Sequence, residues 1–208
     1  APAAFQASTD GFLSLAVALQ PWDAAREAES DAESGALARV RPVFAEALRA
    51  FDPQRMAADA NSTLRVSFGS VRGYSPREAV SYAPQTTVRG LAAKAGEWPF
   101  AAPPELLSAI GAGAWGPWAD AALGAVPVDF LTDLDLTGGN SGSPTLDARG
   151  RLVGLAFDTN YEGIASDWIY DAPVTRAIHV DVRYILWYLD AVAQADALVR
   201  ELGIEPSL

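Results

Sequence analysis

The sequence contains no cysteine and only one histidine, His179, and these shortages exclude several classes of site. Without cysteine the chain has no disulfide, no thiolate metal site and no cysteine nucleophile. A single histidine also rules out a histidine-rich metal cluster. We therefore expect neither a metal ion nor another cofactor.

Basic residues and long apolar runs are also scarce. The 15 Lys and Arg residues are outnumbered by 26 Asp and Glu residues, and the resulting net charge of -11 disfavours nucleic acid and anionic membranes as partners. Glycine, proline or a charged residue interrupts every apolar run before the roughly 20 residues that a spanning helix needs. We expect no membrane span. The chain is nevertheless 50% hydrophobic over 208 residues, which is enough for a sizeable core.

Helix-forming residues dominate the first quarter of the chain. Ala, Leu, Glu and Arg are frequent over residues 10–51. Pro21 predicts a break between two helices, and Pro42 predicts a kink or a restart within the second. Apolar residues recur on one face of this second helix at Leu37, Val40, Phe44 and Leu48.

Strand patterns follow the helical region. Alternation at Leu64, Val66 and Phe68 predicts a half-buried strand, and Gly69-Ser70 predicts a hairpin turn after it. Residues 85–124 are expected to form a long, partly helical connection. Further strands are predicted over residues 126–132, 143–146 and 152–157.

The end of the chain returns to helical spacing. After Pro173, apolar residues recur at near-helical intervals and predict one long amphipathic helix that reaches about residue 202. The order of elements is therefore helical, then β, then helical.

The segment Thr137-Gly-Gly-Asn-Ser-Gly-Ser-Pro144 carries the chemistry. A serine hydroxyl reacts only when a base removes its proton and donors receive the oxyanion. Glycines allow the tight turn in which the N–H groups of Gly139 and Ser141 converge on one point. A bare Gly-x-Ser-Gly is more often a glycine-rich hairpin without chemistry, but the length of this match favours a nucleophile loop with Ser141 as the nucleophile.

Several blocks of the sequence resemble the bacterial dipeptidyl aminopeptidase BII type of serine exopeptidase. This group is the dipeptidyl-peptidase 7 and 11 family of the chymotrypsin clan. The blocks are Asp59-Ala-Asn-Ser-Thr-Leu-Arg65, Gly73-Tyr-Ser-Pro-Arg77, the nucleophile loop, Gly154-Leu-Ala-Phe-Asp158, Asn160-Tyr-Glu-Gly163 and Val180-Asp-Val-Arg-Tyr184.

The resemblance implies a mixed β and α fold within a chymotrypsin-like double β-barrel. Residues 1–57 correspond to the end of an inserted α-helical domain, and residues 58–208 to the carboxyl-terminal barrel part of the peptidase domain with a closing helix. It also implies release of dipeptides from peptide substrates, a homodimer, and a periplasmic or cell-surface location. The first residues lack the regions of a signal peptide, so we expect that a leader was removed or that the chain starts within a longer protein.

The resemblance also assigns two substrate-binding residues. Asp158 corresponds to the residue that binds the free α-amine of the substrate, and the alternative is an aspartate that only caps a turn. Thr159 occupies the position that sets specificity, where members selective for acidic residues have arginine. Because threonine carries no charge, we expect an apolar or small second residue in the substrate. The alternative is that Thr159 only shapes a turn.

The catalytic histidine and aspartate of the family lie in an upstream part that this chain does not contain. His179 lies on the predicted closing helix, and we interpret it as a structural or surface histidine and not as the base. We therefore expect the isolated chain to be inactive. Two other interpretations stay open: a glutamyl-endopeptidase-like serine protease, and a non-catalytic binding module derived from a peptidase.

Overall fold

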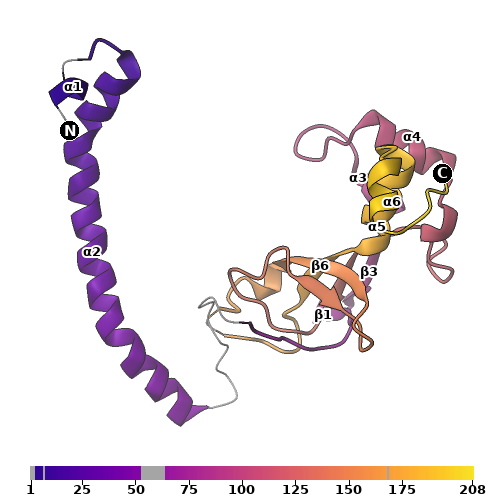
Figure 1. Ribbon diagram of the computed structural model, residues 1–208. Coiled ribbons are helices and arrows are strands. Elements are labelled where there is room, and N and C mark those ends of the chain that lie inside the picture. Colours follow the sequence, from indigo (N-terminus) through magenta and orange to yellow (C-terminus); the bar gives the residue numbers. More distant parts are fainter. Residues whose placement is uncertain (1–2, 7, 53–63, 168) are drawn as a thin grey trace. The chain divides into compact units, whose positions relative to one another are not determined.

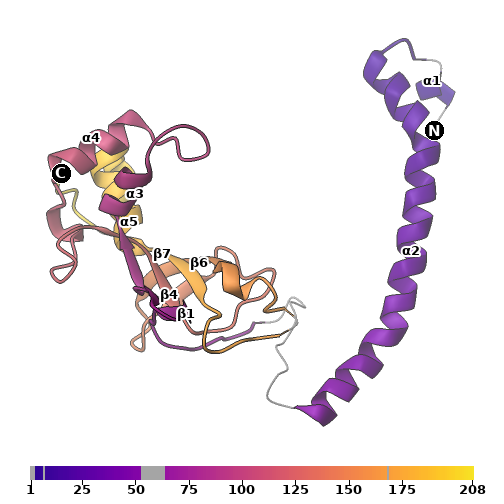
Figure 2. The same cartoon turned by 180° about the vertical axis from the view of Figure 1, so that it is seen from behind.

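The structure is a computed structural model that describes residues 3–6, 8–52, 64–167 and 169–208. The chain divides into two compact units, Ala1–Met56 and Ala57–Leu208 (Figures 1 and 2). That the first is the end of an inserted helical domain, and the second part of a barrel, stays a prediction. Among the described helices, none is long and apolar enough to cross a membrane.

The first unit consists of α1 (Ala3–Gln6) and the long helix α2 (Gly11–Phe51). Asp10 caps α2 by accepting hydrogen bonds from two backbone N–H groups of its first turn at 2.9 and 3.0 Å. The predicted break at Pro21 is wrong, because Pro21 and Pro42 both lie inside one continuous helix. Each proline removes one hydrogen bond, and the strong helix formers on both sides continue the helix past it. In the described chain no residue of α2 is buried.

The second unit is built on a five-stranded antiparallel sheet with the order β3-β4-β7-β6-β5. Its strands are β3 (Gln85–Thr87), β4 (Pro127–Thr132), β5 (Pro144–Leu146), β6 (Leu152–Thr159) and β7 (Ala177–Asp181). The strands predicted over residues 126–132, 143–146 and 152–157 are confirmed, although β6 extends further, to Thr159. The mixed β and α class is confirmed as well, whereas the double β-barrel stays a prediction.

The single long helix predicted after Pro173 is wrong, because the chain first forms strand β7. Buried and half-buried residues alternate along β7, as expected of a strand. Strands β4 and β6 pair with it on either side, so partners distant in sequence decide its conformation. Helical structure begins only afterwards, in α5 (Val182–Trp187), the π-helical segment η4 (Tyr188–Val192) and α6 (Asp196–Glu201).

The strand predicted at Leu64, Val66 and Phe68 is also wrong, and no hairpin turn forms at residues 69–70. These three side chains are 93%, 80% and 92% exposed, and no strand of the described chain pairs with them. Alternation shows which residues share a face, but a strand also needs partners for its N–H and C=O groups. A hairpin that the sequence did not predict forms later, between β1 (Tyr74–Arg77) and β2 (Val80–Tyr82).

The larger hydrophobic core lies at one end of the sheet, where helices α3 (Val88–Lys94), α4 (Pro104–Ala112) and α5 gather (Figures 1 and 2). Its buried members are Val88, Leu106, Ile110, Trp118, Ala125, Val126 and Trp187. We refer to this as the helix end of the sheet. At the opposite end, which we call the loop end, a smaller cluster contains Leu136, Ala156 and Ala177.

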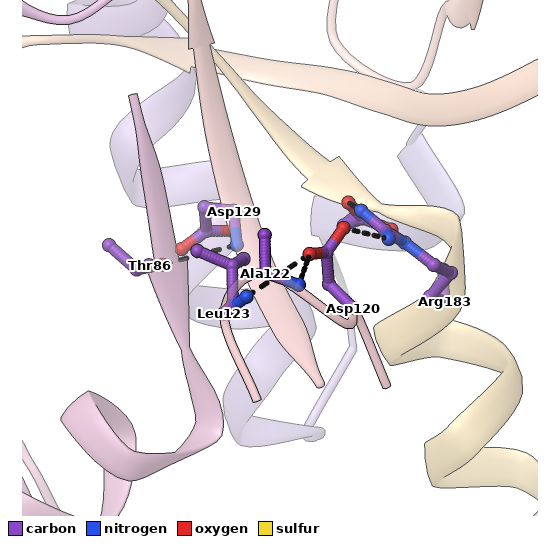
Figure 3. A network of polar contacts seen from close by, with 7 residues as sticks. Thr86, Asp120, Ala122, Leu123, Asp129 and Arg183 are labelled. Atoms are coloured by element: carbon purple, nitrogen blue, oxygen red, sulfur yellow. Dashed lines mark hydrogen bonds and ion pairs between the residues drawn. The ribbon is translucent and has the colours of Figure 1, made fainter. Parts of the chain in front are cut away.

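Paired charges hold α5 at the helix end (Figure 3). Arg183 forms ion pairs of 2.8 Å with both Asp120 and Asp181. Asp120 also accepts hydrogen bonds from the backbone N–H groups of Ala122 and Leu123 at 2.9 and 3.1 Å. The hydrogen bond from Arg183, followed by those from the backbone, lowers the pKa of Asp120. Apolar packing, the ion pairs of Arg183 and the hydrogen bonds of Asp120 therefore fix this end of the sheet.

Candidate active site

The nucleophile loop, residues 133–143, connects the end of β4 to the start of β5. Gly139 and Gly142 have φ angles of 93° and 83°, in a region of backbone conformation that favours glycine. The two glycines flank Asn140 and Ser141 and allow the chain to reverse there. Ser141 is exposed as a result.

The backbone N–H groups of this loop fall into two sets. Those of Asn140, Gly142 and Ser143 donate to backbone oxygens at 3.2, 2.7 and 2.9 Å. Those of Gly139 and Ser141 donate to no acceptor in the described residues. Two N–H groups without internal partners, one on each side of a single residue, suit the binding of an anion. This is the pair that the sequence predicted as the oxyanion hole.

The hydroxyl of Ser141 has one hydrogen-bond partner in the described residues. It donates to the carbonyl oxygen of Phe157 at 3.4 Å, which is long for a hydrogen bond between oxygens. Both ring nitrogens of His179 are bound elsewhere, to the hydroxyls of Thr132 and Thr145. His179 also lies on β7 and not on a helix, so the predicted location was wrong. No base contacts Ser141 within the part of the chain that the structure describes.

A cavity of about 220 Å³ brings Ser141 together with Asp158 and Thr159. Ser141 comes from the nucleophile loop, whereas Asp158 and Thr159 are the last two residues of β6. Gly139 belongs to the same loop as Ser141 but does not line the cavity. Three of the four residues singled out from the sequence therefore meet in one place.

The lining of this cavity is partly apolar and carries no positive charge. Leu136, Phe157 and Ile164 supply apolar surface, and the described lining contains no Lys, Arg or His. Its charged members are the carboxylates of Asp158 and Asp167. The cavity therefore suits a positively charged or apolar group better than a carboxylate.

A bulge in β6 lies directly before Asp158 and Thr159. Pairing with β7 shifts register between Ala156 and Asp158, so that Phe157 is the extra residue. Asp158 and Thr159 follow the bulge and both line the cavity, at the point where β6 ends and the chain turns at Asn160. One carboxylate oxygen of Asp158 accepts a hydrogen bond from the N–H of Thr159 at 2.8 Å, as a turn-capping aspartate does. Its other oxygen has no partner in the described residues.

Asn160 is a positioning residue that the sequence did not single out. It is 7% exposed, and its side-chain oxygen accepts a hydrogen bond from the N–H of Arg176 at 2.8 Å. Its amide group donates to the carbonyl of Val174 at 2.8 Å and to Glu162 at 3.0 Å. These bonds fix the chain directly after Thr159. A polar turn residue at the end of a strand was the only available signal.

A second cavity of about 510 Å³ adjoins the same segment. Tyrosines and two carboxylates line it, including Tyr74, Tyr82, Asp129, Tyr161 and Glu162. It contains none of the residues that the sequence predicted to react. Within the described residues no group of three His, Asp or Glu side chains is placed to hold a metal ion. The cavity at Ser141 is therefore the candidate active site.

Comparison with known families gives a match over almost the whole chain. The sequence model of the family described as Peptidase S46 matches residues 1–204. The Asp/Glu-specific dipeptidyl-peptidase of Shewanella putrefaciens is 40% identical over 225 residues, which covers 96% of this chain and 31% of that protein. Dipeptidyl-peptidase 7 of Porphyromonas gingivalis is 38% identical over 186 residues, covering 87% of this chain and 26% of that protein.

The fold is also similar to a solved structure. The crystal structure of Porphyromonas endodontalis DPP11 in complex with the dipeptide Arg-Glu matches with a TM-score of 0.70 and 36% sequence identity. The match covers 77% of this chain and 23% of that one. The chain thus spans between about a fifth and a third of the length of these proteins.

Proposed function

The chain belongs to the peptidase S46 family, and we propose that it supplies the nucleophile and the oxyanion hole of a serine dipeptidyl-peptidase. The observation that carries the proposal is the position of Ser141, which is exposed at a cavity and whose own N–H group, like that of Gly139, has no acceptor in the described chain. Both residues are exposed, so these N–H groups are open to a substrate oxyanion.

The proposed reaction is acyl transfer. The hydroxyl oxygen of Ser141 attacks the carbonyl carbon of the second residue of the peptide, and a base takes the hydroxyl proton. The carbonyl oxygen becomes an oxyanion that accepts hydrogen bonds from Gly139 and Ser141 N–H. The base then protonates the leaving amine, and water releases the dipeptide in a second step. We propose that the base and its partner carboxylate lie in an upstream part of the protein.

Asp158 is proposed to fix the free amine of the substrate. Its exposed carboxylate lines the cavity that holds Ser141, and one of its oxygens has no partner in the described residues. An ammonium group would give this oxygen a charge-assisted hydrogen bond. Anchoring the amine at a fixed distance from Ser141 would limit cleavage to the second peptide bond, which defines a dipeptidyl-peptidase.

The preference at the second residue has two candidates. The absence of a cation from the described lining, together with Thr159 and the apolar wall, supports an apolar or small second residue. The name of the Shewanella relative, Asp/Glu-specific dipeptidyl-peptidase, does not support this preference and favours an acidic residue instead. In that case a cation from another part of the protein would have to enter the cavity. We propose the apolar preference, because an unpaired buried carboxylate costs several kcal/mol.

Assembly and location are proposals from the family resemblance. We propose a homodimer that acts in the periplasm or at the surface of a bacterium. Size measurement of the full-length product in solution and fractionation of the source cells test the two statements separately.

Labelling of the full-length product with a fluorophosphonate tests the proposed chemistry. The expected result is one modified residue, Ser141, and release of dipeptides from peptides with a free amino terminus. The isolated chain of 208 residues should release none. A full-length protein that neither labels nor cleaves would favour the non-catalytic binding module, and equal cleavage of amino-blocked peptides would favour an endopeptidase.

A pair of fluorogenic dipeptides that differ only in Leu or Asp at the second position tests the specificity. The expected result is a higher kcat/KM for Leu in the parent enzyme. Thr159→Arg should shift the preference toward Asp, since a guanidinium pairs with a carboxylate in a two-bond fork. Thr159→Val, which is also uncharged, is the matched control. A native preference for Asp would contradict the role given to Thr159.

A further inference from the structure

His179, the only histidine, is bound on both sides of its ring. It is 1% exposed, and its Nε2 and Nδ1 atoms each lie 2.7 Å from a hydroxyl oxygen, of Thr132 and Thr145 respectively. The ring also stacks on Phe130 with 4.8 Å between centroids. A neutral imidazole has one donor and one acceptor, and a threonine hydroxyl can act as either, so one neutral ring satisfies both bonds.

The two threonines stand at the two ends of the nucleophile loop. Thr132 is the last residue of β4, and Thr145 lies in β5. Residues 133–143, between these strands, contain Gly139 and Ser141. His179 is therefore hydrogen-bonded to the chain on both sides of the loop that holds the nucleophile.

The contact between His179 and Thr145 spans strand β6. Strand β6 separates β7 from β5, and in a flat sheet strands two places apart lie roughly 10 Å from each other. The side chains of His179 and Thr145 bridge this separation with a hydrogen bond of 2.7 Å. Gly154 on β6 leaves the necessary space, since a Cβ atom there would lie 2.6 Å from the ring of Phe130.

Ala156, a neighbour of His179, also forms hydrogen bonds with the nucleophile loop. Ala156 of β6 is the cross-strand partner of His179. Its carbonyl accepts a hydrogen bond from Gly142 at 2.7 Å, and its N–H donates to the carbonyl of Ser143 at 3.0 Å. Within the loop, the turn is closed by bonds of 3.2 Å from the N–H of Asn140 to the carbonyl of Thr137 and 2.9 Å from the N–H of Ser143 to the carbonyl of Asn140.

We propose that His179 is a positioning residue that clamps the two ends of the nucleophile loop through Thr132 and Thr145. In this role His179 sets the positions of the Gly139 and Ser141 N–H groups and of the Ser141 hydroxyl. It neither contacts the substrate nor acts as the base. This inference rests on the proposed function. An apolar side chain would fill the same space without the desolvation cost of a buried imidazole, so packing alone does not account for the polar ring.

Substitutions at the threonines test the clamp with little change of shape. In the full-length product, Thr145→Val and Thr132→Val should each lower kcat and the rate of fluorophosphonate labelling at Ser141 by about tenfold, because small misplacements of reacting groups are costly. KM should change less than about twofold, since the substrate contacts are intact. Thr145→Ser keeps the hydroxyl and should retain the parent rate.

Thr86→Val is the matched control. Thr86 lies on β3 of the same sheet, and its hydroxyl accepts a hydrogen bond from the N–H of Asp129 at 3.1 Å (Figure 3). It does not contact the loop, so this variant should lose stability without losing labelling rate. If His179→Phe folds, its kcat and labelling rate should fall as much as those of Thr145→Val. If it does not fold, the threonine variants alone test the clamp.

The outcomes separate this inference from the proposed function. A parent protein that neither labels at Ser141 nor releases dipeptides overturns the proposed function and this role with it. An active parent whose Thr145→Val and Thr132→Val variants label no more slowly than Thr86→Val overturns the clamp alone. Loss of rate in Thr145→Ser equal to that in Thr145→Val would also overturn it, because the hydroxyl would then be irrelevant.

Discussion

The helix end and the loop end of the five-stranded sheet differ in how they use polar groups. At the helix end, Asp190 is 1% exposed and accepts hydrogen bonds from the indole N–H of Trp118 at 3.0 Å and the hydroxyl of Ser207 at 2.8 Å. Burial acts against the charge of Asp190, but these hydrogen bonds outweigh it and lower its pKa. At the loop end, the N–H groups of Gly139 and Ser141 have no acceptor in the described residues.

Asp135 extends the contrast. It lies in the nucleophile loop, and one of its carboxylate oxygens is buried without a partner in the described residues. Burial, followed by the charge of Asp167, raises its pKa. An unsatisfied buried polar group costs about 1–3 kcal/mol, so the loop end gives up stability that the helix end keeps. We therefore expect the helix end to carry more of the stability and the loop end to carry the proposed chemistry, so that single substitutions separate the two.

The largest effect is expected at the loop end. In the full-length product, Ser141→Ala should lower kcat by about 10⁴ to 10⁶, because the nucleophile is lost. The free energy of unfolding should change by less than about 0.5 kcal/mol, since the hydroxyl is exposed. Ser81→Ala, at an exposed position of β2, is the control and should change neither quantity. More than a few per cent residual activity in Ser141→Ala would refute the nucleophile.

The opposite pattern is expected at the helix end. Trp187 is 0% exposed and donates a hydrogen bond from its indole N–H to the carbonyl of Ala114 at 3.2 Å. Trp187→Ala should therefore destabilise the protein by about 3–5 kcal/mol, measured by denaturant unfolding. Below the unfolding transition, the labelling rate at Ser141 should stay within about twofold of the parent. A large loss of labelling in the folded variant would show that the two ends are coupled.

Acid should weaken the contacts that His179 makes with the two ends of the nucleophile loop. Burial lowers the pKa of His179 from its usual 6.5 to about 4, so the unfolded chain binds the proton more readily than the folded one. The contribution of His179 to stability is then complete above pH 6.5 and is lost as the pH falls toward 4, by at most about 3 kcal/mol. The measurement is the free energy of unfolding against pH for the parent and for His179→Gln. The difference between the two curves should vary between pH 4 and 6.5 and be flat above; a flat difference throughout would contradict the buried, neutral ring.

The smallest effect is expected for substrate anchoring. Asp158→Asn should lower kcat/KM for peptides with a free amine by about 2 kcal/mol, or roughly 30-fold, because the ammonium loses its counter-ion. For peptides with a blocked amine, kcat/KM should be nearly the same in the parent and in Asp158→Asn. Asp167→Asn provides a matched change of charge in the same cavity and should have the weaker effect. Equal losses for free and blocked peptides would point to the turn-capping role instead.

Much of the loop end could be predicted from sequence because its determinants are local. Glycines on both sides of Asn140 and Ser141 specify the turn, and the flanking strands β4, β5 and β6 follow from alternation within a few residues. The resemblance assigned Asp158 and Thr159 to substrate binding, but the bulge at Phe157 just before them was not predicted, because it depends on pairing with β7.

The errors arose where distant partners decide the outcome. Residues 177–181 have spacing that also fits a helix, but β4 and β6 pair on either side and make them a strand. Leu64, Val66 and Phe68 alternate well and yet form no strand, since nothing in the described chain pairs with them. Periodicity alone does not report whether a partner is present.

The sequence by itself determined the turn that exposes Ser141 and the family to which the chain belongs, and it predicted Ser141 as the nucleophile, because each depends on short blocks of adjacent residues. Only the tertiary structure decided what His179 contacts and which residues share the cavity with Ser141. Those answers depend on how β7 lies between β4 and β6 and on the contact that His179 makes across β6 with Thr145. Such contacts join residues far apart in sequence, so no local pattern contains them.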